Sequence, residues 1–591
     1  MTDESPLDGF GIGVRFRSAN PLEQSDPPVP DLAPGTRILP AGSVHAEGAR
    51  PLTIDIEVFD DVAIPLRDGV TLYGDVYRKA GDGPVPAVLI YTPYVKRGGW
   101  WNHSHAVANF GVPAEHVSGL QPFEALDPAY WCEHGYAIVV VDARGTGHSE
   151  GDMLFMGTAE GRDAYGTVEW IAAQEWCTGK VAMAGNSQLA MVQWAAAALR
   201  PPHLTAIAPW EGLTDTYRYV IGRGGIPDTA FHDDDIIGNL VGLGRFEDMT
   251  AMLAEHPTDN AYWADKRADL SAVDIPAYVV ASWTNAIHSG STEAGFRQLA
   301  STDKWLRIHN TMEWVDIATP DSVDDLRRFF DHYLKGADNG WETTPRVRYA
   351  IIDPGGQDTH HTADTWPPAP LTATTLYLDA ATGTLTPDRP TTPSSISYDS
   401  TDPAAAATFR YTVTRTTELL GPVNLRLWVE TSEGNDLDLF AAVYKLGTDG
   451  ELAYHVPFPG LADLIDALAK EGPLPAPLAY SGPAGRLRVS HRALDPDKST
   501  NLAPYLSHAR EEPVEPGTPV QVDLGLWPTG MRVNPGETLV VEIAGHYAGP
   551  FTPPRGTGGD PNTPIPTLNT GTHTIHTGGH HTSAALLPIT R

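Results

Sequence analysis

The chain has 591 residues, with 74 acidic and 40 basic side chains and a formal net charge of −34. This length exceeds what one hydrophobic core supports, so we expect two or three domains. The acidic balance opposes binding to nucleic acid or to an anionic membrane, and we exclude both as partners. Cys132 and Cys177 are the only cysteines. Two are too few for a disulfide framework or a thiolate zinc site, so we interpret both as reduced core residues.

The N-terminus, MTDESPLDGFGIG, has neither the basic start nor the apolar stretch of a signal peptide. No later stretch reaches the roughly eighteen apolar residues that a membrane-spanning helix needs. The predicted location is therefore the cytoplasm. The sequence leaves open whether the chain forms a homo-oligomer.

The first predicted elements are an arm and a hairpin. Residues 1–52 are rich in Pro and Gly with little periodicity, and they predict an extended arm over the folded part. Between 54 and 76, short alternating runs flank a turn at 67–70, which predicts two antiparallel strands.

Strands then alternate with helices. Apolar runs that end in turn residues predict strands at 85–91, 137–141, 181–184, 277–282 and 304–308. Helical patterns lie at 161–174, after Ser187 and, most strongly, at 321–335. Such alternation is typical of a mainly parallel sheet covered by helices on both faces. We predict an α/β core in two parts, 53–212 and 270–344.

Two further segments differ from this alternation. Residues 213–269 show helices and loops without a strand pattern, which predicts a helical cap over an active site. After residue 344, short strand-like runs are separated by Pro/Gly turns, at 372–378, 423–429, 485–489, 520–526 and 538–543. Only 461–470 keeps a helical pattern. Residues 345–591 therefore predict an all-β sandwich of the jelly-roll type with a mainly structural role.

The segment Val181-Ala-Met-Ala-Gly-Asn-Ser-Gln-Leu-Ala190 places Ser187 directly after an apolar strand and before a helix. This is the arrangement of a nucleophile elbow, in which Gly185 permits the sharp turn and the hydroxyl emerges at the helix N-terminus. Leu189 stands where the usual motif has a second glycine. The segment alone therefore fits a simple helix N-cap at Ser187 equally well.

Further motifs occur in a fixed order around this segment. They are Tyr91-Thr-Pro-Tyr94, Val139-Val-Val-Asp-Ala-Arg-Gly-Thr-Gly-His-Ser-Glu-Gly151, Trp176-Cys-Thr-Gly-Lys180, Ala208-Pro-Trp-Glu-Gly212, Phe329-Phe-Asp-His-Tyr-Leu-Lys-Gly336, Gly485-Arg-Leu-Arg-Val-Ser-His-Arg492 and Thr574-Ile-His-Thr-Gly-Gly579. With them the sequence resembles the cocaine esterase and X-Pro dipeptidyl-peptidase family over residues 56–590. The resemblance implies an α/β-hydrolase fold and a serine hydrolase that forms an acyl-enzyme.

The resemblance also implies an oxyanion hole. The family residue that matches Tyr94 donates its phenol to the oxyanion, and the backbone N–H after the nucleophile, here that of Gln188, is the second donor. Both donors would point at the place where negative charge develops on a tetrahedral intermediate. The alternative for Tyr94 is an ordinary core tyrosine.

The acid position departs from the family pattern. The family has Trp-x-Asp where this chain reads Ser282-Trp-Thr-Asn285, so Asn285 takes the place of the acid. An amide can orient an imidazole but cannot compensate its positive charge. Four carboxylates are the alternatives for the acid: Glu313 and Asp316 as the nearest in sequence, and Glu211 and Asp215 in the early cap.

The histidine position departs as well. The family's Gly-Pro-Trp-x-His has become Lys304-Trp-Leu-Arg-Ile-His-Asn-Thr-Met-Glu-Trp314, and a strict register puts Met312 or Glu313 at the catalytic position. His309 directly follows a strand, where such folds carry their chemistry. We predict His309 as the general base, with His288 as the next candidate and a structural imidazole as the main alternative.

The predicted reaction is acyl transfer from an ester or amide of a small molecule. Ser187 attacks the carbonyl, His309 takes its proton, and Tyr94 and the Gln188 amide hold the oxyanion. The prediction includes no metal and no organic cofactor. Two alternatives remain: a biosynthetic acyltransferase or cyclase, for which a weakened triad suits a nucleophile other than water, and a catalytically degenerate binding protein.

Overall fold

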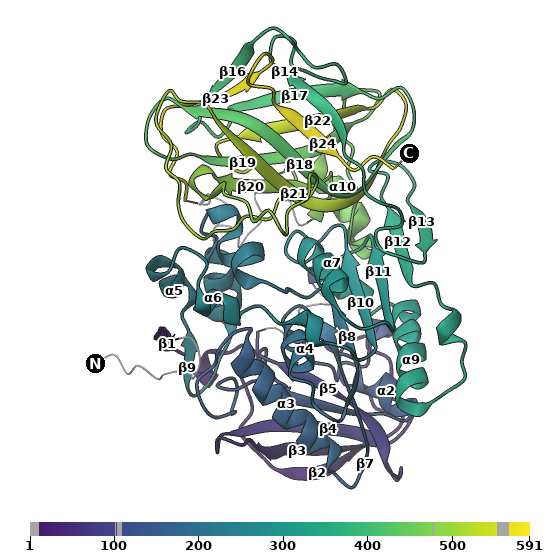
Figure 1. Cartoon of the computed structure of the whole chain (residues 1–591). Coiled ribbons are helices and arrows are strands. Elements are labelled where there is room, and N and C mark those ends of the chain that lie inside the picture. The colour runs from purple at the N-terminus through teal and green to yellow at the C-terminus, as the bar shows by residue number, and fades with distance from the viewer. Residues whose placement is uncertain (1–10, 101, 103–108, 476–477, 552–565, 591) are drawn as a thin grey trace.

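The computed structural model describes residues 11–100, 102, 109–475, 478–551 and 566–590. The first ten residues of the predicted arm lie outside this range. Figure 1 shows an N-terminal part, in which helices cover a sheet, below a C-terminal part made almost entirely of strands. The predicted fold class, an α/β-hydrolase with an all-β domain, is confirmed.

The N-terminal part is built on an eleven-stranded sheet, counted over the described residues, with the order β13-β12-β11-β10-β8-β7-β5-β6-β4-β3-β2. Its centre is formed by β5 (Val85–Thr92), β6 (Ala137–Asp142), β7 (Cys177–Asn186), β8 (Leu204–Trp210), β10 (Ala277–Ser282) and β11 (Lys304–His309). These six strands pair in parallel and are largely buried. Their carboxyl ends therefore meet at one edge of the sheet, where α/β folds place their sites.

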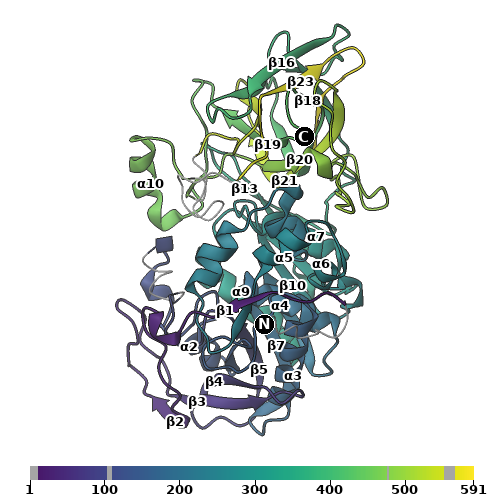
Figure 2. The ribbon, with the colours of Figure 1, turned by 90° about the vertical axis from the view of Figure 1, so that its left-hand side faces the viewer.

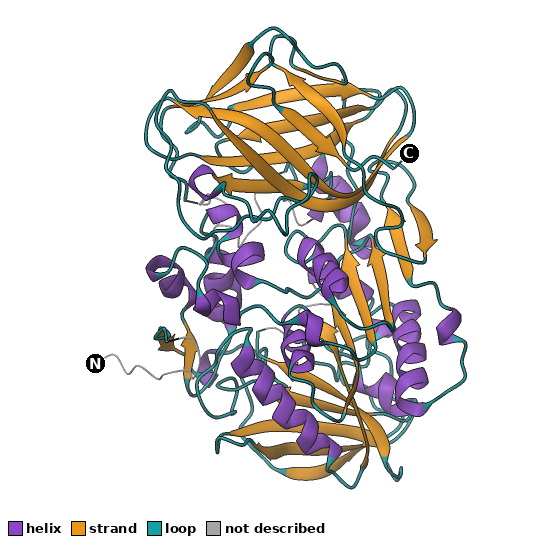
Figure 3. Ribbon diagram, in the orientation of Figure 1, coloured by secondary structure: helices purple, strands orange, loops and turns teal. Residues whose placement is uncertain are grey.

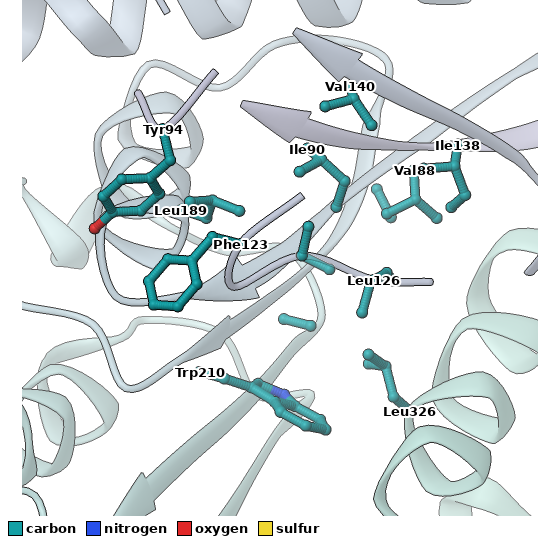
Figure 4. Packing of buried hydrophobic residues seen from close by; sticks show 14 of the residues in the cluster. Val88, Ile90, Tyr94, Phe123, Leu126, Ile138, Val140, Leu189, Trp210 and Leu326 are labelled. Atoms are coloured by element: carbon teal, nitrogen blue, oxygen red, sulfur yellow. The ribbon is translucent and has the colours of Figure 1, made fainter. Parts of the chain in front are cut away.

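Side-chain alternation along the central strands separates two hydrophobic cores. On one face Val88 and Ile90 pack toward α2 (Pro128–Glu133) and α9 (Pro320–Lys335), as Figure 4 shows for Leu326 of α9. On the other face Leu89 packs toward the remaining helices of the core. These are α3 (Thr158–Ala172), α4 (Gln188–Ala198) and α7 (Ser289–Gln298). Successive side chains of a strand point to opposite faces of the sheet, so each central strand supplies apolar side chains to both cores.

The predicted hairpin is confirmed, because β3 (Ile56–Pro65) and β4 (Thr71–Lys79) pair antiparallel. The arm contributes more than predicted. Its strand β2 (Gly35–Leu39) extends the sheet beside β3, and β1 (Phe16–Ser18) pairs with β9 (Arg245–Glu247) in the cap region. In Figure 2, β1 runs across the helices of the N-terminal part. Four of the five residues of β2 are exposed, so no apolar alternation marks this strand in the sequence.

The segment between β8 and β10 consists mainly of short helices and also contains β9; its role as a cap stays a prediction. The helices are η3 (Tyr217–Ile221), η4 (Arg223–Gly225), η5 (Phe231–Ile236), η6 (Ile237–Asn239), α5 (Met249–Glu255), α6 (Ala261–Asp265) and η7 (Leu270–Ala272). Other short helices of this part are η1 (Leu22–Gln24), η2 (Ala114–His116), α8 (Glu313–Asp316) and η8 (Trp341–Thr343). Within the described ranges, no helix is long and apolar enough to cross a membrane. Cys132 and Cys177 are free and buried, as predicted.

The sheet continues beyond residue 344, where we predicted the domain boundary. Strand β12 (Val347–Ile351) pairs parallel with β11, and β13 (Thr359–Ala363) pairs antiparallel with β12. A short apolar strand such as β12 has the same sequence pattern in either kind of domain, so the sequence does not reveal which sheet it joins.

The C-terminal part confirms the all-β prediction (Figure 3). Its strands are β14 (Thr374–Asp379), β15 (Thr384–Thr386), β16 (Ser394–Asp399), β17 (Ala406–Thr412), β18 (Thr417–Thr431), β19 (Asp438–Leu446), β20 (Ala484–Arg488), β21 (Val520–Val533), β22 (Thr538–Ala544), β23 (Thr572–Thr577) and β24 (Ala584–Leu587). The short helices are η9 (Pro459–Leu461), α10 (Ala462–Ala469) and η11 (Val489–His491). Ile465 of α10 packs in one cluster with Met312, so this domain supports the loop after β11. A jelly-roll topology stays a prediction.

Candidate active site

Ser187 joins β7 to α4 at the carboxyl edge of the sheet. Its backbone has φ 55° and ψ −120°, a strained conformation for a residue with a side chain. A Cβ atom at Gly185 would lie 2.7 Å from the Leu189 Cβ, so only glycine fits there. Ser187 occupies the N-cap position, yet its side chain makes no capping hydrogen bond. The strained turn thus leaves the hydroxyl available for another role.

Tyr94 follows β5, the neighbour of β7 in the sheet. Its phenol lies next to the side chains of Ser187 and Glu124, and both influence its protonation. The ring is 3% exposed and meets Phe123 edge to face, with 5.3 Å between centroids (Figure 4). Burial, followed by the negative charge of Glu124, raises the pKa of Tyr94 well above its usual value. The phenol therefore keeps its proton and can donate it in a hydrogen bond.

Gln188 is the first residue of α4, so its backbone N–H has no acceptor within the helix. The Gln188 side chain donates a hydrogen bond from Nε2 to Glu160 Oε1 at 3.0 Å. The backbone N–H of Gln188 and the phenol of Tyr94 therefore both adjoin Ser187.

Glu124 is a site residue that the sequence did not reveal. Its carbonyl accepts a hydrogen bond from the Asn186 N–H at 3.1 Å, and its Oε1 accepts one from Trp314 Nε1 at 3.0 Å. The side chain also meets the Tyr94 phenol. Glu124 is 6% exposed and has a φ of 61°. Burial raises the pKa of this carboxyl to about 8.

His309, the predicted base, is the last residue of β11, and both of its ring nitrogens have polar neighbours. Nε2 lies 2.9 Å from Glu211 Oε1, while Nδ1 lies 3.1 Å from Thr311 Oγ1 and accepts from the Thr311 N–H at 3.3 Å. Within the described part of the chain, no recorded hydrogen bond joins His309 to Ser187. The role of His309 as the general base stays a prediction.

The carboxylate that pairs with His309 is Glu211, which follows β8 and is 1% exposed. Asp316 Oδ2 lies 3.7 Å from His309 Nε2, but the Asp316 carboxylate is held by Arg307 through two hydrogen bonds of 2.7 and 2.6 Å. Although burial opposes it, Arg307 lowers the pKa of Asp316. Asp215 forms ion pairs with arginines of the cap instead.

Asn285 and Glu313 are neighbours. The Asn285 Oδ1 accepts hydrogen bonds from the Ile287 and His288 N–H groups at 2.9 and 3.1 Å, just before α7. The Asn285 side chain also acts to lower the pKa of Glu313. Glu313 is anchored beside the Ser187 turn, because its carbonyl accepts from Asn186 Nδ2 at 3.1 Å. Asn285, which takes the place of the family's acid, therefore lies beside Glu313, one of the two residues that the strict register puts at the histidine position.

Burial keeps the side chains of Glu313 and His288 neutral. Burial and then the charges of Glu124 and Glu211 raise the pKa of Glu313 well above its usual value. His288, whose Nε2 is 3.7 Å from Glu313 Oε2, is 3% exposed, and burial lowers its pKa to about 3. Burial places the pKa of Glu124 at about 8, near neutral pH, so this carboxyl is suited to accept and return a proton there. No set of three or more metal-ligating side chains comes together among the described residues.

Comparison with known proteins gives consistent results. Residues 68–238 match the model of the X-Pro dipeptidyl-peptidase (S15) family, and residues 339–584 match that of the X-Pro dipeptidyl-peptidase C-terminal non-catalytic domain. A solved CocE/NonD family hydrolase from Staphylococcus aureus is 31% identical, with a TM-score of 0.84 over 95% of this chain and 97% of that one.

Two curated relatives are named as esterases. A putative serine esterase from Mycobacterium bovis is 25% identical over 83% of this chain and 90% of its own length. Cocaine esterase from Rhodococcus is 26% identical over 54% of this chain, and that match spans 62% of the esterase.

The fold, together with these matches, defines a hydrolase of the α/β-hydrolase class with a C-terminal all-β domain. The chain belongs to the cocaine esterase and X-Pro dipeptidyl-peptidase family, whose named members here are esterases and peptidases.

Proposed function

We propose that the chain is a serine hydrolase that cleaves an ester or amide of a small molecule through an acyl-enzyme on Ser187. The observation that carries this proposal is the strained turn at Ser187, whose hydroxyl adjoins the buried, neutral phenol of Tyr94. A strained serine at the sheet edge, placed between a strand and a helix, is the geometry of a nucleophile elbow. The proposed steps use only groups of this chain.

The same contacts supply a route for the proton. As Ser187 Oγ bonds to the substrate carbonyl carbon, its proton passes to the Tyr94 oxygen and the Tyr94 proton passes to the Glu124 carboxylate. Tyr94 remains a neutral phenol and, with the Gln188 N–H, donates to the oxyanion. When the intermediate collapses, Glu124 returns its proton through Tyr94 to the leaving group, and water repeats the sequence to release the acyl group.

Glu124 fits this role better than His309 does. Glu124 and Ser187 both adjoin the Tyr94 phenol, whereas His309 lies beside Glu211 and Thr311. A pKa of about 8 also lies near the working range of a general base at neutral pH. Glu313, one of the two residues that the strict register puts at the family's histidine position, is the neutral partner whose carboxyl stays protonated.

A fluorophosphonate probe tests the nucleophile, because it phosphonylates an activated serine and spares an inert one. We expect one label per chain, located on Ser187 by peptide mass spectrometry. No reaction, or a label elsewhere, would remove the assignment and favour a binding protein. If the acyl group is instead transferred to an added amine or alcohol in preference to water, the enzyme is an acyltransferase.

Replacing Tyr94 with Phe is expected to lower kcat by roughly ten- to a thousand-fold with little change in KM. The lost hydroxyl serves both the proton route and the oxyanion, and both interactions strengthen in the transition state. Steady-state kinetics on a short-chain nitrophenyl ester measure this. A change in KM alone would make Tyr94 a substrate contact.

A further inference from the structure

A cavity lies between the cap, α7 and the all-β domain, with a volume of about 170 Å³. Ser187, Tyr94 and Glu124 are not among the described residues that line it. Four arginines contribute to its wall: Arg218, Arg223, Arg297 and Arg486. The chain as a whole carries a net charge of −34, so the presence of four arginines around one cavity needs a physical explanation.

Three of these arginines are neutralised by carboxylates. Arg218 pairs with Asp215 at 2.9 Å and with Asp259 at 2.8 Å. The other two pairs are Arg297 with Glu293 at 2.9 Å and Arg486 with Asp228 at 2.6 Å. These three side chains are therefore explained by the protein's own structure.

Arg223 is different, since no carboxylate of the described ranges lies within ion-pair distance of its guanidinium. Its Nη2 donates to the Ala484 carbonyl at 3.0 Å, and its Cζ stacks 4.1 Å from the Trp527 ring centroid. Asp228, the neighbouring acid, is already paired with Arg486. Burial and the charge of Arg486 lower the pKa of Arg223 well below its usual value. A partly buried cation without a counter-ion costs free energy.

The rest of the wall includes Trp527 and Pro528 as well as the acid Asp523, which pairs with Arg426. The Trp527 ring stacks on Tyr219 with 5.7 Å between centroids. Such an aromatic surface favours a ligand with an apolar body over an inorganic anion, which would gain nothing from it. A guanidinium matches a carboxylate through two parallel hydrogen bonds.

We propose that this cavity binds a small organic carboxylate, whose charged group pairs with Arg223 and whose apolar body packs against Trp527. The site is separate from the proposed chemistry at Ser187 and does not depend on it. Pairing with the ligand would supply the counter-ion that Arg223 lacks.

Isothermal titration calorimetry on the full chain tests the proposal, with phenylacetate as the probe and phenylacetamide as its neutral isostere. We expect saturable binding of one phenylacetate, and at least tenfold weaker binding of phenylacetamide, on the order of a lost charge-assisted contact. Phosphate is expected to bind more weakly than phenylacetate. Equal binding of phosphate would contradict an organic ligand.

Arg223→Met should weaken phenylacetate binding at least tenfold, roughly the loss of one charge-assisted contact, without lowering the melting temperature, because it removes an unpaired charge. Arg200→Gln is the matched control, since Arg200 is an exposed arginine paired with Asp274, and it should bind as the wild type does. If Arg223→Met does not fold, Arg223→Lys provides the test. It keeps the positive charge but cannot form the two parallel hydrogen bonds of a guanidinium to a carboxylate. Unchanged affinity in either variant, or no saturable binding by the wild type, overturns the proposal.

Discussion

Ser187→Ala should abolish hydrolysis of short-chain nitrophenyl esters, with a loss of kcat/KM of at least about 10³-fold. Without the hydroxyl no acyl-enzyme can form. The melting temperature should stay nearly unchanged, because the Ser187 side chain makes no capping hydrogen bond to α4. Its removal also relieves no strain, since the backbone turn is fixed by Gly185 and the packing of Leu189.

Two readouts make this result specific. The melting temperature shows that the variant is folded, and the fluorophosphonate label at residue 187 should disappear with the activity. Wild-type activity in Ser187→Ala would show that another group attacks the ester. A large fall in melting temperature would instead give the hydroxyl the structural role of a cap.

The central strands were predictable because their signal is local. Each is an uninterrupted apolar run that ends in turn residues, and a strand covered on both faces needs this pattern. Strands β2 and β12 lack such a signal. β2 is mostly exposed at the sheet edge, and the short apolar run of β12 does not tell which domain it joins. Membership of a sheet depends on partners far away in sequence.

The same distinction applies to the site. Ser187, Gln188 and Tyr94 follow directly on strands β7 and β5, so their placement at the sheet edge could be read from local sequence. His309 also lies at a strand end, but its partner Glu211 comes from the end of β8. Nothing local to residue 309 indicates that this carboxylate would engage the imidazole.

Glu124 had the weakest signal of the site residues. It stands alone in an irregular segment after Phe123, with no strand or helix pattern that would direct its side chain. Its position follows from the backbone hydrogen bond to Asn186 and from the contact with Trp314, both formed only in the folded chain. An isolated buried acid of this kind is revealed by packing and not by spacing.

Glu124→Gln is therefore the sharpest test of the proton route. The amide preserves the size of the side chain and the contact with Trp314, but it cannot accept a proton. We expect kcat to fall by about 10²- to 10⁴-fold, the usual contribution of general base catalysis. The wild-type rate should also depend on pH. The carboxylate is the active form, so kcat/KM should rise toward a plateau as the pH increases through about 8, and this rise should be absent from Glu124→Gln.

Glu313→Gln is the matched control, because Glu313 is an equally buried acid beside the same turn. Its carboxyl is held protonated, so the amide replaces one neutral group by another, and we expect less than about a tenfold loss of kcat. His309→Ala completes the set and should keep the dependence on pH near 8. If His309→Ala abolishes activity while Glu124→Gln retains it, the imidazole accepts the proton after its bonds to Glu211 and Thr311 rearrange. If Glu313→Gln alone is inactive, Glu313 is the base.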